Sequence, residues 1–272
     1  MIKRFFSTDI PDVRVFLQEE PDNLITLNAG LRSVDLLYFD VWLTRGDSGA
    51  VTAVLFRNYW DFYLKAEAEA DLEEIASFLH HLPMLGTLNC HTDTAESLLP
   101  LLHNVNDTVQ CTVAVQHEPP QPLAYELDYV RVQSMEDYRR VYDLLALSES
   151  IEISRFEDYY FLRRNTDKSW TGRTYCLHHE AIAYAAASTS GECEGMALIT
   201  DVATHPDYRR KGLGKALVTN LCSDLHDALM IPYVKYSTEV AAHFYDHLGF
   251  AETYKSARIY FQASASANRK LF

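Results

Sequence analysis

The most informative stretch of this chain is residues 198–217, LITDVATHPDYRRKGLGKAL. A strand is expected over about 196–204, because Pro206 and Asp207 end it. Beyond the glycines, an apolar stripe at helical spacing is formed by Leu213, Leu217 and Leu221, with Val218. The stretch therefore predicts a strand, a short loop and a helix.

Two glycines, Gly212 and Gly214, stand where this helix is expected to begin. Glycines leave the backbone N–H groups open to a close approach by an anion, and the helix dipole favours negative charge at that end. A pyrophosphate would fit there. For an isolated GxG, a tight turn before a core helix is the alternative.

The spacing excludes two other phosphate-binding motifs. A P-loop has the pattern GxxxxGK[ST], but here Ala216 takes the place of the hydroxyl residue and Arg209 takes the place of the first glycine. A dinucleotide fingerprint has the pattern GxGxxG or GxGxxA, but its last position here is Leu217. Both motifs fail at required positions.

The remaining pattern, RRKGLG over residues 209–214, closely resembles the (Q/R)xxGx(G/A) signature of the GNAT acetyltransferase superfamily. Downstream, YVKYSTEVAAHFYDHLGF over 233–250 is similar to that family's fifth strand, next helix and FYxxxGF ending. The similarity covers roughly residues 126–262. It implies an α/β fold of mixed α+β type, with a mixed, mostly antiparallel central sheet flanked by helices.

The resemblance also implies acetyl-coenzyme A as cosubstrate, bound in a V-shaped opening between the fourth and fifth strands. Backbone groups of 202–204 would pair with the pantetheine arm, and the first of these N–H groups would polarise the thioester carbonyl. The N–H groups of 210–215 would cradle the pyrophosphate. The implied cofactor-binding residues are Val202, Ala203, Thr204, Arg209, Arg210, Lys211, Gly212, Leu213, Gly214, Lys215 and Thr238. A solvated basic turn is an equal alternative for each side chain of 209–211.

The implied reaction is direct attack of an acceptor amine on the thioester, giving an amide and free coenzyme A. Tyr245 maps onto the family's general acid, whose phenol, with an ordinary pKa near ~10, can protonate the leaving thiolate. For Tyr245 alone, a half-buried aromatic on a helix is the alternative. Thr238 stands where many relatives have an asparagine that bonds the cofactor arm. The predicted enzyme is an N-acetyltransferase.

One departure concerns the base that takes the proton of the amine. Many relatives have a glutamate on the fourth strand, where this chain has Leu198. Asp201, Glu194 and Glu239 are substitutes by position in the sequence, and each has a solvated surface carboxylate as its alternative. The missing glutamate keeps a second function open, that of a non-catalytic regulatory module that senses acyl-coenzyme A.

No metal site is expected. His243 and His247 lie one helical turn apart, but position 244 is Phe where HExxH zinc proteins have a glutamate, and no third ligand is indicated. The five cysteines form no CxxC pair, which favours reduced thiols in a cytoplasmic protein. The N-terminus does not resemble a secretion signal, and no apolar run approaches the ~20 residues that span a bilayer.

A length of 272 residues favours two domains. The Pro-containing stretch 117–123 suggests a division into 1–122, an accessory α+β domain, and 123–272, the catalytic GNAT domain. The first half is expected to hold strands at 38–44, 51–56, 86–90 and 108–115 and helices at 71–82 and 93–103. This order would suit a degenerate copy of the same fold, with an unrelated α+β domain as the alternative.

In the second half we expect strands at 125–132, 172–178 and 181–188, and a helix over 134–145 with Ser134 as N-cap. Residues 149–170 contain the aromatic cluster Phe156, Tyr159, Tyr160 and Phe161. This segment is either an acceptor-binding loop or, the favoured interpretation, a helix with core aromatics.

The formal net charge of −14 is unevenly distributed. Residues 1–125 carry 7 Lys/Arg and 18 Asp/Glu, net −11, and residues 126–272 carry 17 and 20, net −3. Such an acidic chain is a poor candidate for binding nucleic acid or an anionic membrane surface. The expected acceptor is a small-molecule or peptide amine, and the acidity would favour a cationic one.

Overall fold

The structure, a computed structural model, describes residues 1–32, 39–82, 85–123, 127–148, 151 and 155–262. The chain forms two compact units. The first unit comprises the described residues of Met1–Gly30, Asp35–Val113 and Tyr254–Phe272, and the second unit those of Leu31–Val34 and Ala114–Thr253. The end of the chain thus belongs to the first unit. The functional division at 122/123 remains a prediction.

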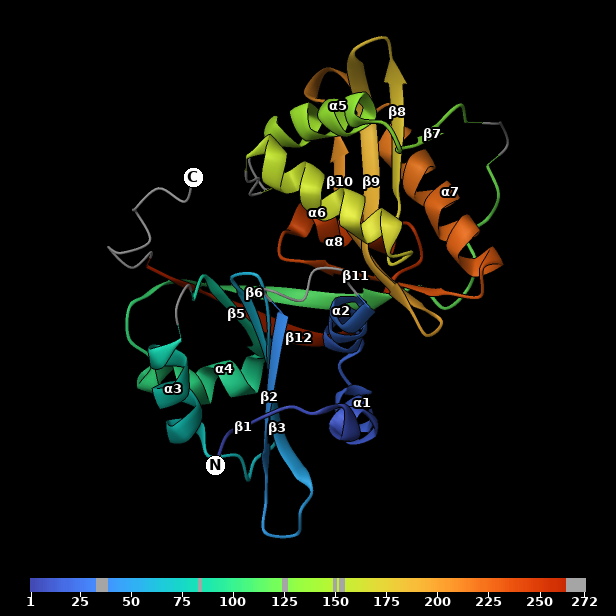
Figure 1. The fold of residues 1–272 in the computed structure, drawn as a ribbon. Helices are drawn as coiled ribbons and strands as arrows, with labels where there is room; N and C mark the ends of the chain where they lie inside the picture. The colour runs from blue at the N-terminus through green and yellow to red at the C-terminus, as the bar shows by residue number, and fades with distance from the viewer. Residues whose placement is uncertain (33–38, 83–84, 124–126, 149–150, 152–154, 263–272) are drawn as a thin grey trace. The chain divides into compact units, whose positions relative to one another are not determined.

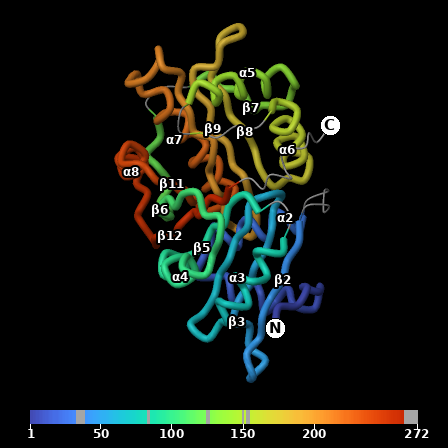
Figure 2. Tube along the Cα trace, turned by 90° about the vertical axis from the view of Figure 1, so that its left-hand side faces the viewer, coloured from blue at the N-terminus to red at the C-terminus, as the bar shows by residue number. Residues whose placement is uncertain are grey.

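The second unit is a sheet with helices on both faces. Its elements are β7 (Val130–Arg131), α5 (Met135–Ala146), α6 (Phe156–Lys168), β8 (Thr174–His179), β9 (Ile182–Cys193), β10 (Met196–Thr204), α7 (Leu213–Asp227), β11 (Ile231–Tyr236) and α8 (Glu239–Asp246). The strand order is β11-β10-β9-β8-β7, antiparallel except for the parallel pair β10 and β11. Figure 2 shows α6 and α7 on opposite sides of β8 and β9.

Alternating side chains of the strands build the two cores of the second unit. On β9, Ala183 and Ala186 pack with α5 and α6, whereas Ala185 and Ala187 pack with α7 and α8. From Ala185 to Ala187 the side chains alternate between the faces with the period of two that a sheet covered on both faces requires. Ala183 lies on the same face as Ala186 because β9 has one residue more than β8 between Ala183 and Ala185. Small residues on the central strand let both helix layers approach closely.

The first unit contains β1 (Lys3–Arg4), α1 (Ile10–Leu17), α2 (Pro21–Arg32), β2 (Phe39–Arg45), β3 (Val51–Asn58), β4 (Asp61–Ala66), α3 (Leu72–His81), β5 (Thr87–His91), α4 (Thr92–Leu98) and β6 (Val105–Val115). The last two residues of α2 and of β6 are assigned to the second unit. Figure 1 shows α1 and α2 on one side of β2 and β3, and α3 and α4 on the other. The last strand of the chain, β12 (Ala251–Phe261), pairs antiparallel with β5 from Ser256 to Tyr260.

The order of elements is the same in the two halves of the chain. From β1 to β6, and again from β7 to β12, it is strand, two helices, three strands, helix, strand, helix, strand. The pairings also match, because β4 and β5 are parallel as β10 and β11 are, while β2-β3-β4 and β8-β9-β10 are antiparallel. The prediction of a degenerate copy rests on this shared order.

The mixed, mostly antiparallel fold with flanking helices is confirmed. The predicted helix over 134–145 is α5, and Ser134 accepts from the Asp137 N–H as its N-cap. The strand predicted over 125–132 is shorter than expected: residues 124–126 lie outside the described residues, and only Val130–Arg131 are extended. The Tyr129 N–H donates to the Leu127 carbonyl at 3.0 Å, a tight turn that breaks the strand.

Two further differences concern helices of the first half. The helix predicted over 93–103 ends at Leu98 and continues only as a 3-10 turn, because Pro100 lacks a backbone N–H. The helices α1 and α2 were not predicted. Among the described residues, no helix combines the length and the apolar character needed to cross a membrane.

Candidate active site

The strands β10 and β11 separate partway along their length. Their parallel pairing runs from Met196 opposite Ile231 to Ile199 opposite Val234, and among the described residues it stops there. Yet β10 continues to Thr204 and β11 to Tyr236. The end of β10 therefore has an edge that β11 does not cover.

A bulge in β10 accompanies this separation. Thr200 lies opposite Ser188 and Ala203 opposite Ala186, so β10 has one residue more than β9 between these pairs. Asp201 adopts a left-handed backbone conformation, with φ of 50°. A bulge of this kind bends a strand and re-aims the residues that follow, which here are Val202, Ala203 and Thr204.

The N-terminus of α7 is open to an anion. Its N-cap residue is Gly212, with φ of 80°, which offers no side chain to cap the first N–H groups. The first turn of α7 holds no acidic residue, whereas the first turn of each other described α-helix does. Since the first N–H groups of a helix have no acceptor within the helix, this end can bind a phosphate.

The basic side chains before α7 are exposed and partly packed on the loop itself. Arg209 donates from Nε to the Thr204 carbonyl at 3.2 Å, and Lys211 Nζ lies 4.6 Å from the centre of the Tyr208 ring. Tyr208 in turn stacks on Tyr184, with ring centroids 4.1 Å apart. Arg210 has a left-handed φ of 63°. The loop is thus held against the end of β10, and its cations stay at the N-terminus of α7.

Tyr245, the predicted general acid, lies on α8 and is 8% exposed. Its ring stacks on Tyr236 at 5.5 Å and meets Phe250 edge-on at 5.4 Å. Burial raises the pKa of Tyr245 well above its ordinary value, and the neighbouring Cys222 and Asp201 raise it further. The phenol therefore keeps its proton at neutral pH, as a general acid must.

The structure distributes the other predicted site residues as follows. Thr238 is the N-cap of α8 and accepts from the Ala241 N–H at 3.2 Å. Leu198 is buried on β10, at the position where many relatives have the glutamate that acts as the general base. Glu239 is exposed at the start of α8, and Glu194 is exposed in the turn before β10.

Asp201 is engaged by a residue that sequence reasoning missed. Arg163 of α6 is buried and forms an ion pair with the Asp201 carboxylate. These residues are far apart in the sequence, and Arg163 sits in a charged stretch of α6 that gave no sign of burial. A base role for Asp201 therefore competes with this contact.

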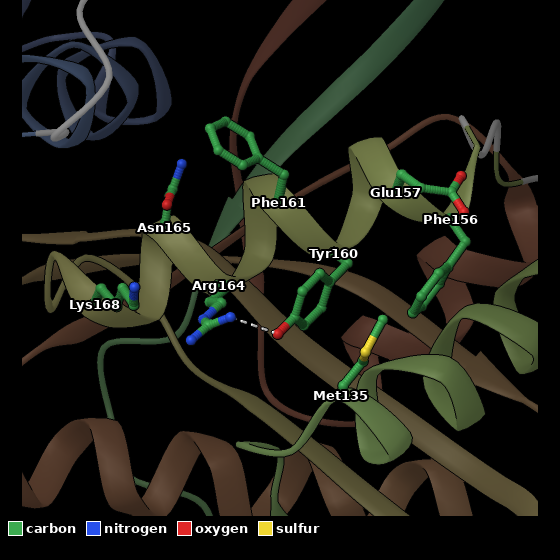
Figure 3. A pocket seen from close by; sticks show the side chains of 8 residues that line it. All are labelled: Met135, Phe156, Glu157, Tyr160, Phe161, Arg164, Asn165 and Lys168. Atoms are coloured by element: carbon green, nitrogen blue, oxygen red, sulfur yellow. Dashed lines mark hydrogen bonds between the residues drawn. The ribbon is translucent and has the colours of Figure 1, made fainter.

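Of the segment 149–170 with the aromatic cluster, residues 156–168 form the helix α6, and 149–150 and 152–154 lie outside the described residues. Phe156 and Tyr159 are buried against α5, as the favoured interpretation predicts, whereas Phe161 is half exposed. The outer side of α6 borders an open cavity of about 390 Å³, shown in Figure 3. It is lined by Met135, Phe156, Glu157, Tyr160, Phe161, Arg164, Asn165 and Lys168. Arg164 donates to the Tyr160 hydroxyl, one turn earlier on α6, at 2.8 Å.

Within the described ranges, no group of three or more His, Cys, Asp or Glu residues is placed to hold a metal ion. His243 and His247 are exposed, and a ring nitrogen of His247 donates to the His243 carbonyl at 2.6 Å. The absence of a metal from the reaction stays a prediction.

Comparisons with known proteins agree with this geometry. The model of the acetyltransferase (GNAT) family matches residues 134–250. No curated protein matches the chain. Among solved structures, a Drosophila protein is similar over 97% of this chain and 99% of its own, with a TM-score of 0.71 and 10% identity.

Two further solved structures share the fold. A GCN5-related N-acetyltransferase from Sphaerobacter thermophilus has a TM-score of 0.64 and 12% identity, covering 95% of this chain and 94% of its own. A tandem GNAT protein from the clavulanic acid biosynthesis pathway has a TM-score of 0.61 and 14% identity, covering 97% and 98%. At these identities the structures show the fold alone, and the family model matches the part of the chain that carries both sequence motifs. Residues 134–250 therefore form a domain of the acetyltransferase (GNAT) family.

Proposed function

We propose that this chain transfers an acetyl group from acetyl-coenzyme A directly to a primary amine of a small molecule or peptide. The observation that carries the proposal is the edge of β10 left uncovered beyond Ile199, next to the open N-terminus of α7. The uncovered edge can pair with a strand-like pantetheine arm, and the helix N-terminus beside it can bind the anionic pyrophosphate of the same molecule.

The residues at this opening fit acetyl-coenzyme A. The edge of 202–204 offers backbone donors and acceptors to the pantetheine arm, in the manner of an added strand. The backbone of 210–215 surrounds the N-terminus of α7, where Gly212 and Gly214 present no side chains to a pyrophosphate. Arg209, Arg210 and Lys211 add positive charge, and Thr238 stands at the N-terminus of α8 beyond β11.

Two groups of the protein would then act on the reacting atoms. The first N–H of the Val202–Thr204 edge polarises the thioester carbonyl and stabilises the oxyanion that forms on it. The amine, after losing its ammonium proton to water, attacks the carbonyl carbon through its free electron pair. The carbon–sulfur bond then breaks, and the nitrogen gives a second proton to water as the amide forms. Tyr245, which keeps its proton because its pKa is raised, donates that proton to the leaving thiolate.

We place this site in the second half of the chain because the corresponding helix of the first unit is closed to anions. The Asp71 side chain caps α3 by accepting from the Glu74 N–H at 2.9 Å, and Glu73 and Glu74 occupy its first turn. Negative charge there repels a pyrophosphate. Residues 1–122 are therefore proposed as an accessory, degenerate GNAT-like domain, and 123–272 as the catalytic domain.

The class of acceptor follows from charge. Residues 1–125 carry a net charge of −11, which creates a field that attracts cations. A cationic amine in the cytoplasm is the acceptor that we propose, whereas nucleic acid and membrane surfaces are disfavoured. A second candidate function is that of a non-catalytic sensor of acyl-coenzyme A. One observation favours it: the buried Leu198 stands where many relatives have the glutamate that acts as the general base.

One experiment separates the two functions. Thiol release from acetyl-coenzyme A is followed with polyamines, amino sugars, amino acids and short peptides as acceptors, and acetylated products are identified by mass spectrometry. Amine-dependent thiol release with a matching acetylated product supports the enzyme. Binding of acetyl-coenzyme A with no release on any amine supports the sensor, and no binding at all contradicts both.

A further inference from the structure

The guanidinium of Arg163 joins one helix to two strands of the second unit. The side chain is buried and donates to the Thr189 carbonyl of β9 at 3.0 Å. It also donates to Thr200 Oγ1 of β10 at 3.1 Å and to the Asp201 carboxylate. A planar guanidinium has five donors in a fixed fork, so it can hold such a set of acceptors at defined positions.

These contacts fall on the bulge of β10. Thr200 is the last residue paired with β9 before the bulge, and Asp201 is the residue with the left-handed backbone. Aspartate tolerates this conformation better than most residues. The residues that follow are the edge 202–204, so the direction of that edge depends on how the bulge is held.

We propose that Arg163 is a positioning residue for acetyl transfer: through Asp201 it fixes the bulge of β10, and thereby the edge Val202–Thr204 that receives acetyl-coenzyme A. This inference rests on the proposed function. It gives Asp201 a role other than that of a base, because its carboxylate is used to hold the bulge.

The Asp201 carboxylate also influences the general acid. Tyr245 is among the groups whose pKa it raises. Burial is the main cause of that shift, and the Arg163 contact holds the Asp201 charge in a fixed position. The ion pair of Arg163 and Asp201 thus lies between the edge Val202–Thr204 and the general acid Tyr245 in its influence on the site.

A purely structural role is the competing explanation. Buried ion pairs often serve packing alone, and Arg173 with Glu192 forms another such pair in the same unit, with two contacts of 2.7 Å. A structural role would loosen the whole unit when Arg163 is replaced. A positioning role would loosen the bulge and weaken binding of acetyl-coenzyme A while the rest of the unit stays folded.

The test uses variants that avoid an unpaired buried charge. In Arg163→Met with Asp201→Asn, both charges are removed together, and asparagine keeps the tolerance for the left-handed backbone. Arg163→Lys is the single variant, and it keeps a positive charge beside Asp201. Arg140→Met is the matched control, because Arg140 is a similarly shielded arginine paired with Glu136 and Asp137 on α5.

Two measurements are made on the full chain: the dissociation constant for acetyl-coenzyme A by calorimetry, and amide hydrogen exchange without ligand. We expect the double variant to bind at least tenfold more weakly and to exchange faster over 200–204, with α5 and α7 unchanged. Arg163→Lys should fall between, since a lysine ammonium carries its donors on one atom and lacks the planar fork that holds the acceptors in position. Arg140→Met should bind within twofold of wild type.

The outcomes separate this inference from the proposed function. If wild type binds acetyl-coenzyme A and the double variant binds it equally well, Arg163 is not a positioning residue and the proposed function stands. If exchange rises equally throughout the second unit, the role is structural, which overturns the inference. If wild type itself binds no acetyl-coenzyme A, the proposed function is wrong and the inference falls with it.

Discussion

Gly214 in the first turn of α7 lies directly against Thr204, the last residue of β10. A Cβ atom on Gly214 would stand 2.5 Å from Thr204 Oγ1, closer than such atoms approach in proteins. The absence of a side chain at Gly214 thus sets how closely the N-terminus of α7 approaches the uncovered edge of β10. This distance in turn sets the span between the proposed pantetheine and pyrophosphate sites.

Gly214→Ala should therefore weaken binding of acetyl-coenzyme A by tenfold or more. Thr204 is β-branched and stiff, so its hydroxyl cannot swing away at low cost, and α7 must shift instead. Overpacking costs about 1–3 kcal/mol, while the better helix propensity of alanine returns about 1 kcal/mol. We expect a small loss of unfolding free energy in urea and a large loss of affinity in calorimetry. Adding Thr204→Ala removes the clashing hydroxyl and should restore affinity; if it does not, the close approach is not the cause.

Gly212→Ala should act through backbone conformation rather than space. Nothing lies within 4 Å of a Cβ at this position, but φ is +80°. Forcing alanine into this conformation costs about 1–2 kcal/mol or turns the backbone away. Gly195→Ala is the control, because Gly195 has a φ of +78° in the turn before β10. Both variants should lose similar thermal stability, and only Gly212→Ala should lose affinity for acetyl-coenzyme A. Equal losses of affinity would show that the turn at Gly212 does not form the anion site.

Tyr245→Phe should lower turnover by about 10²–10⁴-fold while acetyl-coenzyme A still binds, which is the size of effect that a general acid contributes. Tyr233→Phe is the control, since it removes a phenol from the neighbouring strand β11. The measurement is kcat with the best amine of the acceptor panel, together with the dissociation constant of acetyl-coenzyme A. Unchanged turnover in Tyr245→Phe would exclude the acid role.

Local chemistry explains what the sequence could predict. The strand 196–204 matches β10 residue for residue, and the helix after the glycines matches α7, because proline and glycine end and begin elements by their own backbone properties. The capping box of Ser134 and Asp137 marks the start of α5 for the same reason.

Long-range contacts explain what the sequence could not predict. In α2, Asp22, Asn23 and Asn28 occupy buried positions, which hides the apolar stripe of the helix. Two of them have partners outside the helix, because Tyr254 donates to Asp22 and Arg14 donates to Asn28 at 3.1 Å. Asn23 donates to Glu20, just before the helix. The contact of Arg163 with Asp201 is of the same kind, because a charged residue in a charged stretch predicts exposure until its partner is known.

One acetyl-coenzyme A should bind per chain. The two halves share their order of elements, but α3 begins with the Asp71 cap and two glutamates, whereas α7 begins with glycine and no acid. Calorimetric titration of the full chain should give a stoichiometry near one. Asp71→Ala should lower the unfolding free energy by about 1 kcal/mol through loss of the cap, and leave the affinity unchanged. A second site, or a loss of affinity in Asp71→Ala, would contradict the assignment of the site to the second half.

Stability should fall in alkaline solution through the buried tyrosines of the second unit. Burial raises the pKa of Tyr138 and of Tyr175 to about 12, and it raises the pKa of Tyr245 further. In the unfolded chain these phenols ionise near pH ~10. Below that pH both states hold the protons and stability does not depend on them; above it the unfolded state loses protons first, so stability falls as pH rises from about 10 towards 12. Each group should contribute on the order of 1 kcal/mol over this range.

Urea unfolding between pH 8 and 11.5, with tyrosinate absorbance at 295 nm, measures the effect. Tyr138→Phe should reduce the slope of the unfolding free energy against pH. A free energy that stays flat through pH 11 would show that these phenols ionise equally in the folded and unfolded states.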